Sequence, residues 1–314
     1  MDRNNDEPGG ANKRLTSLID QFMEDARERK KYAESTLQGY SSLKELIIRY
    51  STGGDIDLSS LDRAYYMGFQ QWMYSEDYSS NYVQKQWSRL KTVLRFGTDE
   101  GQLEDQDPIF RKLPVKKVDT DHIYLTDDEI ERVASLNLEE NPRLRRIRDI
   151  FLVGAYTGLR FCDLIRLETS HVSAEKGSRI IRMVMKKTNR EVVIPCKPFV
   201  YEVLMRYGGR LPQLSDVSYN RYLKEVGQKA GLDGEVKMRS YEGGVVGNTS
   251  FRKWEKLTSH TARRSFATNL FKQGVSPVVI QKMTGHTNTK VLMSYIKMDG
   301  EESAVMMAGH SFFS

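Results

Sequence analysis

The sequence predicts a mainly α-helical protein with a small β-sheet, divided into two domains. Four amphipathic segments between residues 14 and 105 have apolar residues at helical spacing and predict an all-helical domain. The region after the next, aperiodic segment combines further helical patterns with a pair of segments rich in β-branched residues. The length of 314 residues accommodates two domains.

The helical domain is expected over residues 14–105, after a flexible tail at 1–13 that contains Pro8 and two glycines. Residues 106–122 are expected to form a linker, because they lack periodicity and carry two prolines. The second domain is expected over 123–314, with a C-terminal tail from about residue 299. The apolar stripe of the first helix consists of Leu15, Leu18, Ile19, Phe22, Met23 and Ala26.

The second domain begins with a helix-start signal, because Thr126 and Glu129 have the spacing of a capping box. Residues 179–185 and 190–194 flank a Lys-Lys-Thr-Asn sequence and predict a β-hairpin. The glycine-rich stretch from Tyr241 to Asn248 is expected to interrupt the secondary structure. Helices are expected over about 127–136, 143–156, 198–208 and 216–230, and again from about residue 260.

The composition excludes several classes of protein. Hydrophobic residues make up 39% and charged residues 29% of the chain, which is typical of a globular protein, and no apolar run suits a membrane-spanning helix. Cys162 and Cys196 have no metal-ligand spacing, so we expect a reduced, cytoplasmic protein without a zinc site. The net charge of +6 permits an anionic partner without proving one.

Four short segments of the second domain carry the residues that suggest chemistry. They are Thr157-Gly158-Leu159-Arg160, Lys186-Lys187-Thr188, His260-Thr261-Ala262-Arg263, and Gly285-His286 followed by Tyr295. Each has an ordinary structural alternative when it is taken singly. An arginine after a Thr-Gly turn usually forms a salt bridge at a helix start, and a tyrosine between apolar residues is usually a semi-buried aromatic.

In this order and at this spacing, the segments resemble the tyrosine recombinase (phage integrase) family, in particular the integrases of bacterial phages and conjugative transposons. The family pattern is Arg, Lys, His-x-x-Arg, His or Trp, and Tyr, and His286 precedes Tyr295 by the nine positions that it requires. Residues 14–105 are similar to the family's core-binding domain, a SAM-like four-helix unit. Residues 123–300 are similar to its mixed α+β catalytic domain.

The resemblance implies that Tyr295 attacks a DNA phosphate. Attack on a phosphodiester develops negative charge on its non-bridging oxygens, which Arg160 and Arg263 are suited to bind through planar guanidinium groups. His286 is expected to supply a further donor, and His260 to remove the phenol proton, because imidazole titrates near neutrality.

By the same resemblance, Lys187 is the general acid that protonates the leaving 5′ oxygen, with Lys186 as the alternative on the opposite face of a strand. We expect no metal ion or other cofactor, because no carboxylate cluster is apparent. Asp163 is expected to hold the arginine or histidine network in place. The sequence departs from the commonest family form at Ala262 and Arg264, where many relatives have leucine and histidine.

Contacts with DNA outside this site are harder to assign. Lys85 and Arg89 lie one turn apart on the fourth predicted helix, opposite its apolar stripe, and are candidates for contacts with backbone phosphates. A solvated helix face explains the same pattern equally well. A basic run is formed by Arg143, Arg145, Arg146 and Arg148, whose alternative partners are Glu139, Glu140 and Asp149.

The implied partners are double-stranded DNA and other copies of the chain, with four protomers acting on two DNA sites, and accessory DNA-bending or directionality proteins. The segment from Asp299 to Phe313 is expected to dock on a neighbouring protomer or on its own domain. The alternative functions are a type IB topoisomerase, a DNA invertase, a dimer resolvase and a catalytically silent DNA-binding protein. Only a short segment precedes the first helix, so an arm-binding domain is either dispensable or outside this sequence.

Overall fold

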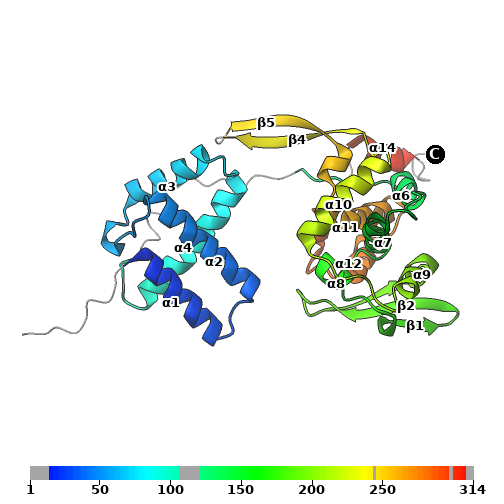
Figure 1. The fold of residues 1–314 in the computed structure, drawn as a ribbon, viewed down its shortest axis with the longest axis horizontal. Helices are drawn as coiled ribbons and strands as arrows, with labels where there is room; N and C mark the ends of the chain where they lie inside the picture. The colour runs from blue at the N-terminus through cyan, green and yellow to red at the C-terminus, as the bar shows by residue number, and fades with distance from the viewer. Residues whose placement is uncertain (1–13, 106–120, 243–244, 297–299, 309–314) are drawn as a thin grey trace, which may run out of the picture. The chain divides into compact units, whose positions relative to one another are not determined.

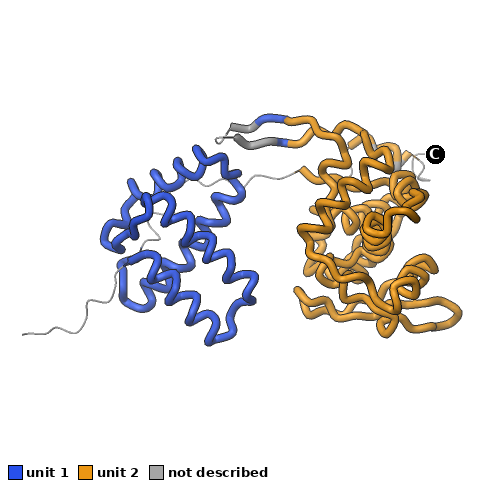
Figure 2. The backbone as a smooth tube through the Cα atoms, viewed as in Figure 1, with its two compact units in different colours: residues 1–120, 239–248 blue, residues 121–238, 249–314 orange. Residues whose placement is uncertain are grey.

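The computed structural model describes residues 14–105, 121–242, 245–296 and 300–308 (Figure 1). It is mainly helical with small sheets, as the sequence predicts. The chain divides into two compact units (Figure 2). Unit 1 comprises residues 1–120 and 239–248, and unit 2 comprises residues 121–238 and 249–314. The predicted tail at 1–13 and most of the predicted linker lie outside the described residues.

The four helices expected in unit 1 are confirmed as α1 (Leu15–Glu28), α2 (Glu34–Tyr50), α3 (Arg63–Ser75) and α4 (Ser80–Asp99). A short 3-10 helix, η1 (Leu58–Ser60), precedes α3. Asp62 and Ser79 cap α3 and α4 by accepting hydrogen bonds from backbone N–H groups. The four helices enclose one apolar core, because each contributes buried residues from one face.

Unit 2 is built around two adjacent helices, α7 (Pro142–Thr157) and α11 (Ser259–Lys272). The predicted capping box is confirmed, since Thr126 and Glu129 make both of its hydrogen bonds at the start of α6 (Asp127–Ala134). The remaining helical elements are α8 (Phe161–Leu164), η2 (Thr169–His171), α9 (Pro198–Arg206), α10 (Asp216–Lys229), η3 (Lys253–Lys256), α12 (Pro277–Thr284), α13 (Thr289–Met293) and α14 (Gly300–Ala308).

The predicted hairpin is confirmed as β2 (Ser178–Val184) and β3 (Glu191–Pro195), which pair antiparallel with Ile181 opposite Ile194. A third strand, β1 (Val172–Glu175), pairs with the other edge of β2. The sequence did not reveal β1, because its four residues are half polar and none is buried. The buried face of β2 and β3 packs into the core of unit 2.

The prediction of an irregular stretch from Tyr241 to Asn248 is wrong over most of its length. β4 (Glu235–Glu242) and β5 (Val245–Arg252) form a separate two-stranded sheet in this region. In the described part of β4, half-buried Val236 and Met238 alternate with exposed Glu235, Lys237 and Arg239. The glycines of the following stretch hid this pattern in the sequence. Backbone pairing joins the two strands, and Val236 of β4 packs against the core of unit 2.

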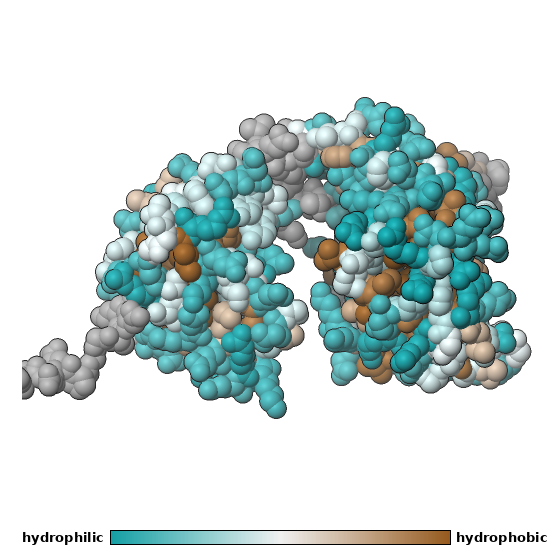
Figure 3. Space-filling view, in the orientation of Figure 1, coloured by the Kyte–Doolittle hydropathy of each residue, from teal (hydrophilic) through white to brown (hydrophobic). Residues whose placement is uncertain are grey.

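The face of the molecule shown in Figure 3 is largely hydrophilic, in keeping with the composition. In the described part of the chain, no helix combines the length and the apolar character needed to cross a membrane.

Candidate active site

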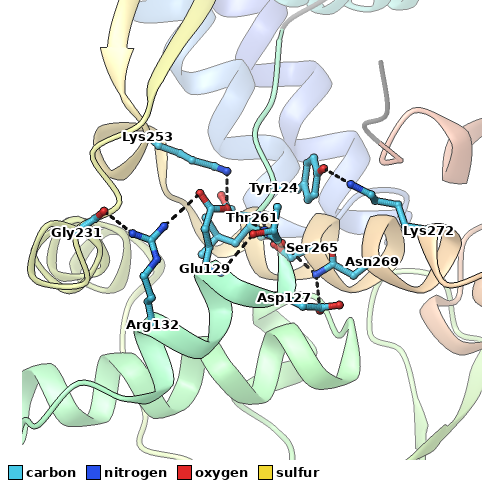
Figure 4. Close-up of polar contacts among 12 residues, drawn as sticks. Tyr124, Asp127, Glu129, Arg132, Gly231, Lys253, Thr261, Ser265, Asn269 and Lys272 are labelled. Carbon is cyan, nitrogen blue, oxygen red and sulfur yellow. Dashed lines mark hydrogen bonds and ion pairs between the residues drawn. The ribbon is translucent and has the colours of Figure 1, made fainter. Parts of the chain in front are cut away.

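Helix α11 is fixed by a polar network on the side that faces α6 (Figure 4). Ser265 accepts a hydrogen bond from the backbone N–H of Leu125 at 2.8 Å, and Asn269 donates to the Leu125 carbonyl at 3.1 Å. Both bonds are buried and join residues far apart in the sequence. Buried polar groups whose hydrogen bonds are all made rigidify their surroundings. We therefore expect α11 to hold the side chains on its other faces in fixed positions.

Three of those side chains are His260, Arg263 and Arg264. Their spacing of three and four residues places them along one side of α11. Arg263 is fully buried, Arg264 is half-buried and His260 is accessible to solvent. Solvent exposure therefore increases from Arg263 through Arg264 to His260.

The segment that carries Arg160 depends on a glycine. Gly158 ends α7 with φ of 66°, in the left-handed region that favours glycine. A Cβ atom at this position would lie 2.4 Å from the Phe266 ring, so the turn also requires close packing. Arg160 follows as the residue before α8, with its Nη1 atom buried and without a hydrogen-bond partner among the described residues.

Arg263 connects three segments of unit 2. Its Nη1 atom donates to the Gly158 carbonyl, and its Nη2 atom donates to the Thr284 carbonyl, each at 2.6 Å. Nη2 also lies 3.0 Å from Nε2 of His286. Burial, assisted by the charge of Arg160, lowers the pKa of Arg263 to about 9. The group is still positively charged at neutral pH.

These contacts define the tautomer of His286, which is 1% exposed. A guanidinium only donates, so Nε2 accepts from Arg263 and the proton is on Nδ1, which donates to Thr284 Oγ1 at 2.7 Å. Burial and the charges of Arg263 and Arg160 lower the pKa of His286 to about 3. The ring is therefore neutral, and both of its nitrogens are engaged within the protein in this arrangement.

Tyr295 reaches the site from the turn that follows α13, where its backbone N–H donates to the Leu292 carbonyl at 2.8 Å. Its ring centre is 4.6 Å from that of His286 and 6.3 Å from that of His260. The guanidinium carbons of Arg263 and Arg264 lie 5.7 Å and 5.5 Å from the same ring centre. The tyrosine is half-buried and belongs to the same chain as all four neighbours.

His260 is suited to accept a proton at neutral pH. Desolvation by the surrounding protein, followed by the charges of Arg264 and Arg263, lowers the pKa of its imidazole. The neutral form therefore predominates near pH 7, and its edge remains open to solvent.

Lys187 is exposed in the turn between β2 and β3. Among the described interactions, it makes no contact with the other five predicted site residues. The turn itself is anchored. Buried Asp163 accepts a hydrogen bond from the backbone N–H of Lys186 at 2.7 Å and pairs with Arg166 at 3.3 Å. Asp163 was expected to hold the arginine or histidine network. Its described hydrogen bonds include those with the lysine turn and with Arg166, and its charge also acts on Arg263.

The structure thus groups His260, Arg263, His286 and Tyr295 by direct geometry. Arg160 joins them through its charge, which lowers the pKa of Arg263, His260 and His286. Among the described contacts, Lys187 is linked to this group through its turn, which Asp163 anchors at Lys186 and which Arg190 joins to the carbonyl of His286.

Comparisons with known proteins identify the family. Residues 124–302 match the profile of the phage integrase family, and residues 14–112 match the phage integrase SAM-like domain. The chain belongs to the phage integrase family. It is accordingly a tyrosine recombinase, and the predicted fold class and enzyme class are confirmed.

Curated relatives of the recombinase include tyrosine recombinase XerD of Listeria innocua, which is 23% identical over 287 residues, 90% of this chain and 94% of the relative. Tyrosine recombinase XerA of Thermococcus onnurineus is 26% identical over 72% of this chain and 74% of its own.

Solved structures share the fold. A lambda integrase dimer (residues 75–356) bound to a COC′ core site has a TM-score of 0.69 at 20% identity and covers 91% of this chain and 96% of its own. The Tn1549 transposon integrase in complex with transposon right end DNA has a TM-score of 0.66 at 16% identity, covering 95% and 99%.

Two residues near the site were missed by the sequence reasoning. Arg190, at the end of the lysine turn, donates from Nη1 to the carbonyls of His286 and Thr287 at 3.1 and 3.4 Å. A cavity of about 370 Å³ opens there, with Glu191 and Lys282 also in its wall. Arg264 was noted only as a departure from the family pattern. No sequence signal marks Arg190 or Arg264 as part of the site, because an arginine in a turn or on a helix is usually solvated.

The candidate DNA contacts on α4 have different surroundings. Lys85 is exposed, but Arg89 is half-buried, donates to Gln86 at 3.1 Å and packs its guanidinium against Gly39 of α2. Arg89 therefore has a packing role within unit 1, and its contact with DNA stays a prediction. In the basic run, Arg148 pairs with buried Asp149 at 2.9 Å, so this arginine has an internal structural role.

Within the described residues, no three His, Cys, Asp or Glu side chains gather as a metal site. Independence from metal ions stays a prediction.

Proposed function

We propose that this recombinase cuts duplex DNA by attack of Tyr295 on a backbone phosphate. The Oη–P bond forms as the P–O5′ bond breaks, which leaves a 3′-phosphotyrosine and a free 5′ hydroxyl. A 5′ hydroxyl of a second strand then reverses the step, so the phosphodiester energy is conserved. The observation that carries the proposal is the position of the Tyr295 ring among His286, Arg263, Arg264 and His260 of its own chain.

The phosphate would be bound by Arg160 and Arg263. Nη1 of Arg160 and Nε of Arg263 are buried donors without partners among the described residues. Such donors are rare in folded proteins and call for a ligand, and a phosphate oxygen satisfies them with charge-assisted hydrogen bonds. His286 would act chiefly by orienting Arg263, because both of its ring nitrogens are already bonded.

The two protons of the reaction have separate carriers in this proposal. His260, neutral near pH 7, takes the proton of the Tyr295 hydroxyl. Lys187 gives a proton to the leaving 5′ oxygen, from an exposed turn that Asp163 holds at its base. Lys186 is less suited, because its backbone forms the anchored side of that turn.

The biological role proposed is integration and excision of a mobile DNA element, in the cytoplasm, by protomers assembled on two double-stranded DNA sites. Support comes from the likeness to a lambda integrase tetramer bound to a Holliday junction, with a TM-score of 0.67 at 19% identity. Val305 of α14 is 76% exposed, which suits docking of this helix on a neighbouring protomer. Accessory DNA-bending or directionality proteins belong to the same proposal.

Covalent trapping tests the chemistry. Nicked suicide substrates, built from DNA that flanks the gene, are incubated with the wild-type protein or Tyr295→Phe in EDTA and run on a denaturing gel. A protein–DNA band with the wild type only is the expected result. DNA binding by both proteins without any covalent band on any flanking site would overturn the proposal in favour of a silent DNA-binding protein.

A further inference from the structure

Arg264 is a third guanidinium at the nucleophile, and no role has been given to it above. It follows Arg263 directly and lies one turn after His260 on α11. Its guanidinium carbon is 5.5 Å from the centre of the Tyr295 ring, slightly closer than that of Arg263. Its Nε atom is buried and has no hydrogen-bond partner within the described part of the chain.

The charge of Arg264 is not balanced by an ion pair among the described contacts of the site. Burial lowers the pKa of Arg264. The negative charge of an ionised Tyr295 acts in the opposite direction and raises it. A desolvated cation beside a phenol favours the phenolate, because a Coulomb interaction is stronger away from bulk water. Arg263, by contrast, already donates to two carbonyls and to His286.

The same cation acts on His260. After desolvation, Arg264 is the largest cause of the lowered pKa of this imidazole. Its charge therefore keeps the proton acceptor unprotonated at the pH where the phenol must lose its proton.

We propose that Arg264 is a positioning residue that stabilises the phenolate of Tyr295 and keeps His260 neutral to receive its proton. The inference rests on the proposed function, since it concerns the same step. The other groups around the tyrosine are Arg263, His260, His286 and, more distantly, Arg160. The acidic groups that act on these are Asp163 and Asp216.

The test measures the rate of covalent complex formation on a nicked suicide substrate from pH 6 to pH 9. Wild type is compared with Arg264→Gln and Arg264→Lys, with Lys272→Gln as the control. Lys272 also lies on α11, but it contacts Tyr124 at 3.3 Å. Arg264→Gln should be about 10-fold slower at pH 7, with its profile moved about one unit to higher pH. Arg264→Lys should recover most of the profile, and Lys272→Gln should match wild type.

A second readout separates this role from a structural one. Placing the more acidic 3,5-difluorotyrosine at position 295 should remove most of the Arg264→Gln defect. The hydroxyl of this residue ionises more readily, so its ionisation depends less on a nearby cation. A pH-independent loss that fluorination does not reduce would overturn the proposal, as would an Arg264→Gln profile identical to wild type. The wild-type band is scored first, so a failure of the recombinase chemistry itself is recognised separately.

Discussion

At the scale of single residues, Arg263 combines a proposed catalytic role with buried hydrogen bonds that stabilise unit 2. Its guanidinium donates to the carbonyls of Gly158 and Thr284 and contacts His286. Arg263→Ala would leave these acceptors without partners and open a cavity, so we expect a loss of about 2–4 kcal/mol in the free energy of unfolding. Urea denaturation of the purified proteins measures it.

Tyr295→Phe is the matched control for that prediction, since it removes a hydroxyl from a half-buried ring. We expect its free energy of unfolding to stay within about 0.5 kcal/mol of wild type. Equal stability of Arg263→Ala and wild type would show that the buried hydrogen bonds are replaced by water.

His286 makes stability depend on pH. Its pKa is about 3 in the folded protein and near 6.5 when unfolded, so the unfolded state binds the extra proton between these values. Stability contributed by the neutral ring is present above pH 6.5 and is lost as the pH falls toward 3. His286→Gln should lose less stability between pH 7 and pH 5 than wild type in urea denaturation. An equal loss in both proteins would contradict the pKa shift.

The identities of the candidate site residues came from their order and spacing, but their interactions did not. The nine-residue spacing between His286 and Tyr295 cannot show that His286 accepts a hydrogen bond from Arg263. That bond depends on the burial of both groups. The proximity of Arg264 to Tyr295 depends on how α13 packs against α11 and α12. Packing of this kind is absent from local sequence patterns.

At the scale of elements, the turn between β2 and β3 is held from outside the sheet at both of its ends. The Lys186 N–H donates to Asp163, and Arg190 donates to the carbonyls of His286 and Thr287. Asp163→Ala should let the turn move and displace Lys187. We expect covalent complex formation to slow about 10-fold, less than the 100-fold or greater loss expected for Lys187→Ala as a missing general acid. DNA binding, measured by gel shift, should be retained.

A substrate with sulfur in place of the leaving 5′ oxygen distinguishes this effect from general misfolding. A thiolate leaves without protonation, so both variants should regain rates near wild type on this substrate. A defect in Asp163→Ala that persists with the sulfur substrate would place its role outside proton donation.

The helix α4 carries the other element-scale prediction. Exposed Lys85 is a candidate phosphate contact, and Lys85→Gln should reduce the salt dependence of DNA affinity by about one phosphate contact. Lys44→Gln is the control, because Lys44 already pairs with Asp20 at 2.5 Å. Binding isotherms at several salt concentrations give the slopes, and equal slopes for Lys85→Gln and wild type would favour the solvated face.

Helices were predictable from the sequence because each buries one stripe, as Leu15, Leu18 and Ile19 do in α1. Strands β4 and β5 were not, because the glycines between Tyr241 and Asn248 indicated a break and the alternating Val236 and Met238 are only half-buried. The hairpin of β2 and β3 was visible because buried Ile181, Met183 and Ile194 alternate with exposed neighbours along their strands.

At the scale of the whole molecule, unit 2 contains all six candidate catalytic residues, and its tyrosine lies in the site of its own chain. We therefore expect Tyr295 to act within its own chain, where Arg263 and His286 lie. Each protomer would then have a complete active site of its own, and assembly on DNA would bring several such sites together.

Mixing two inactive variants tests this claim most directly. Tyr295→Phe lacks the proposed nucleophile, and Arg160→Gln lacks one of the two arginines proposed to bind the phosphate. They are combined at equal concentration on a nicked suicide substrate. If each tyrosine attacks within its own chain, the mixture should give no more covalent complex than the two variants give separately. A strong covalent band in the mixture would show that one protomer donates its tyrosine to another, and would contradict the account.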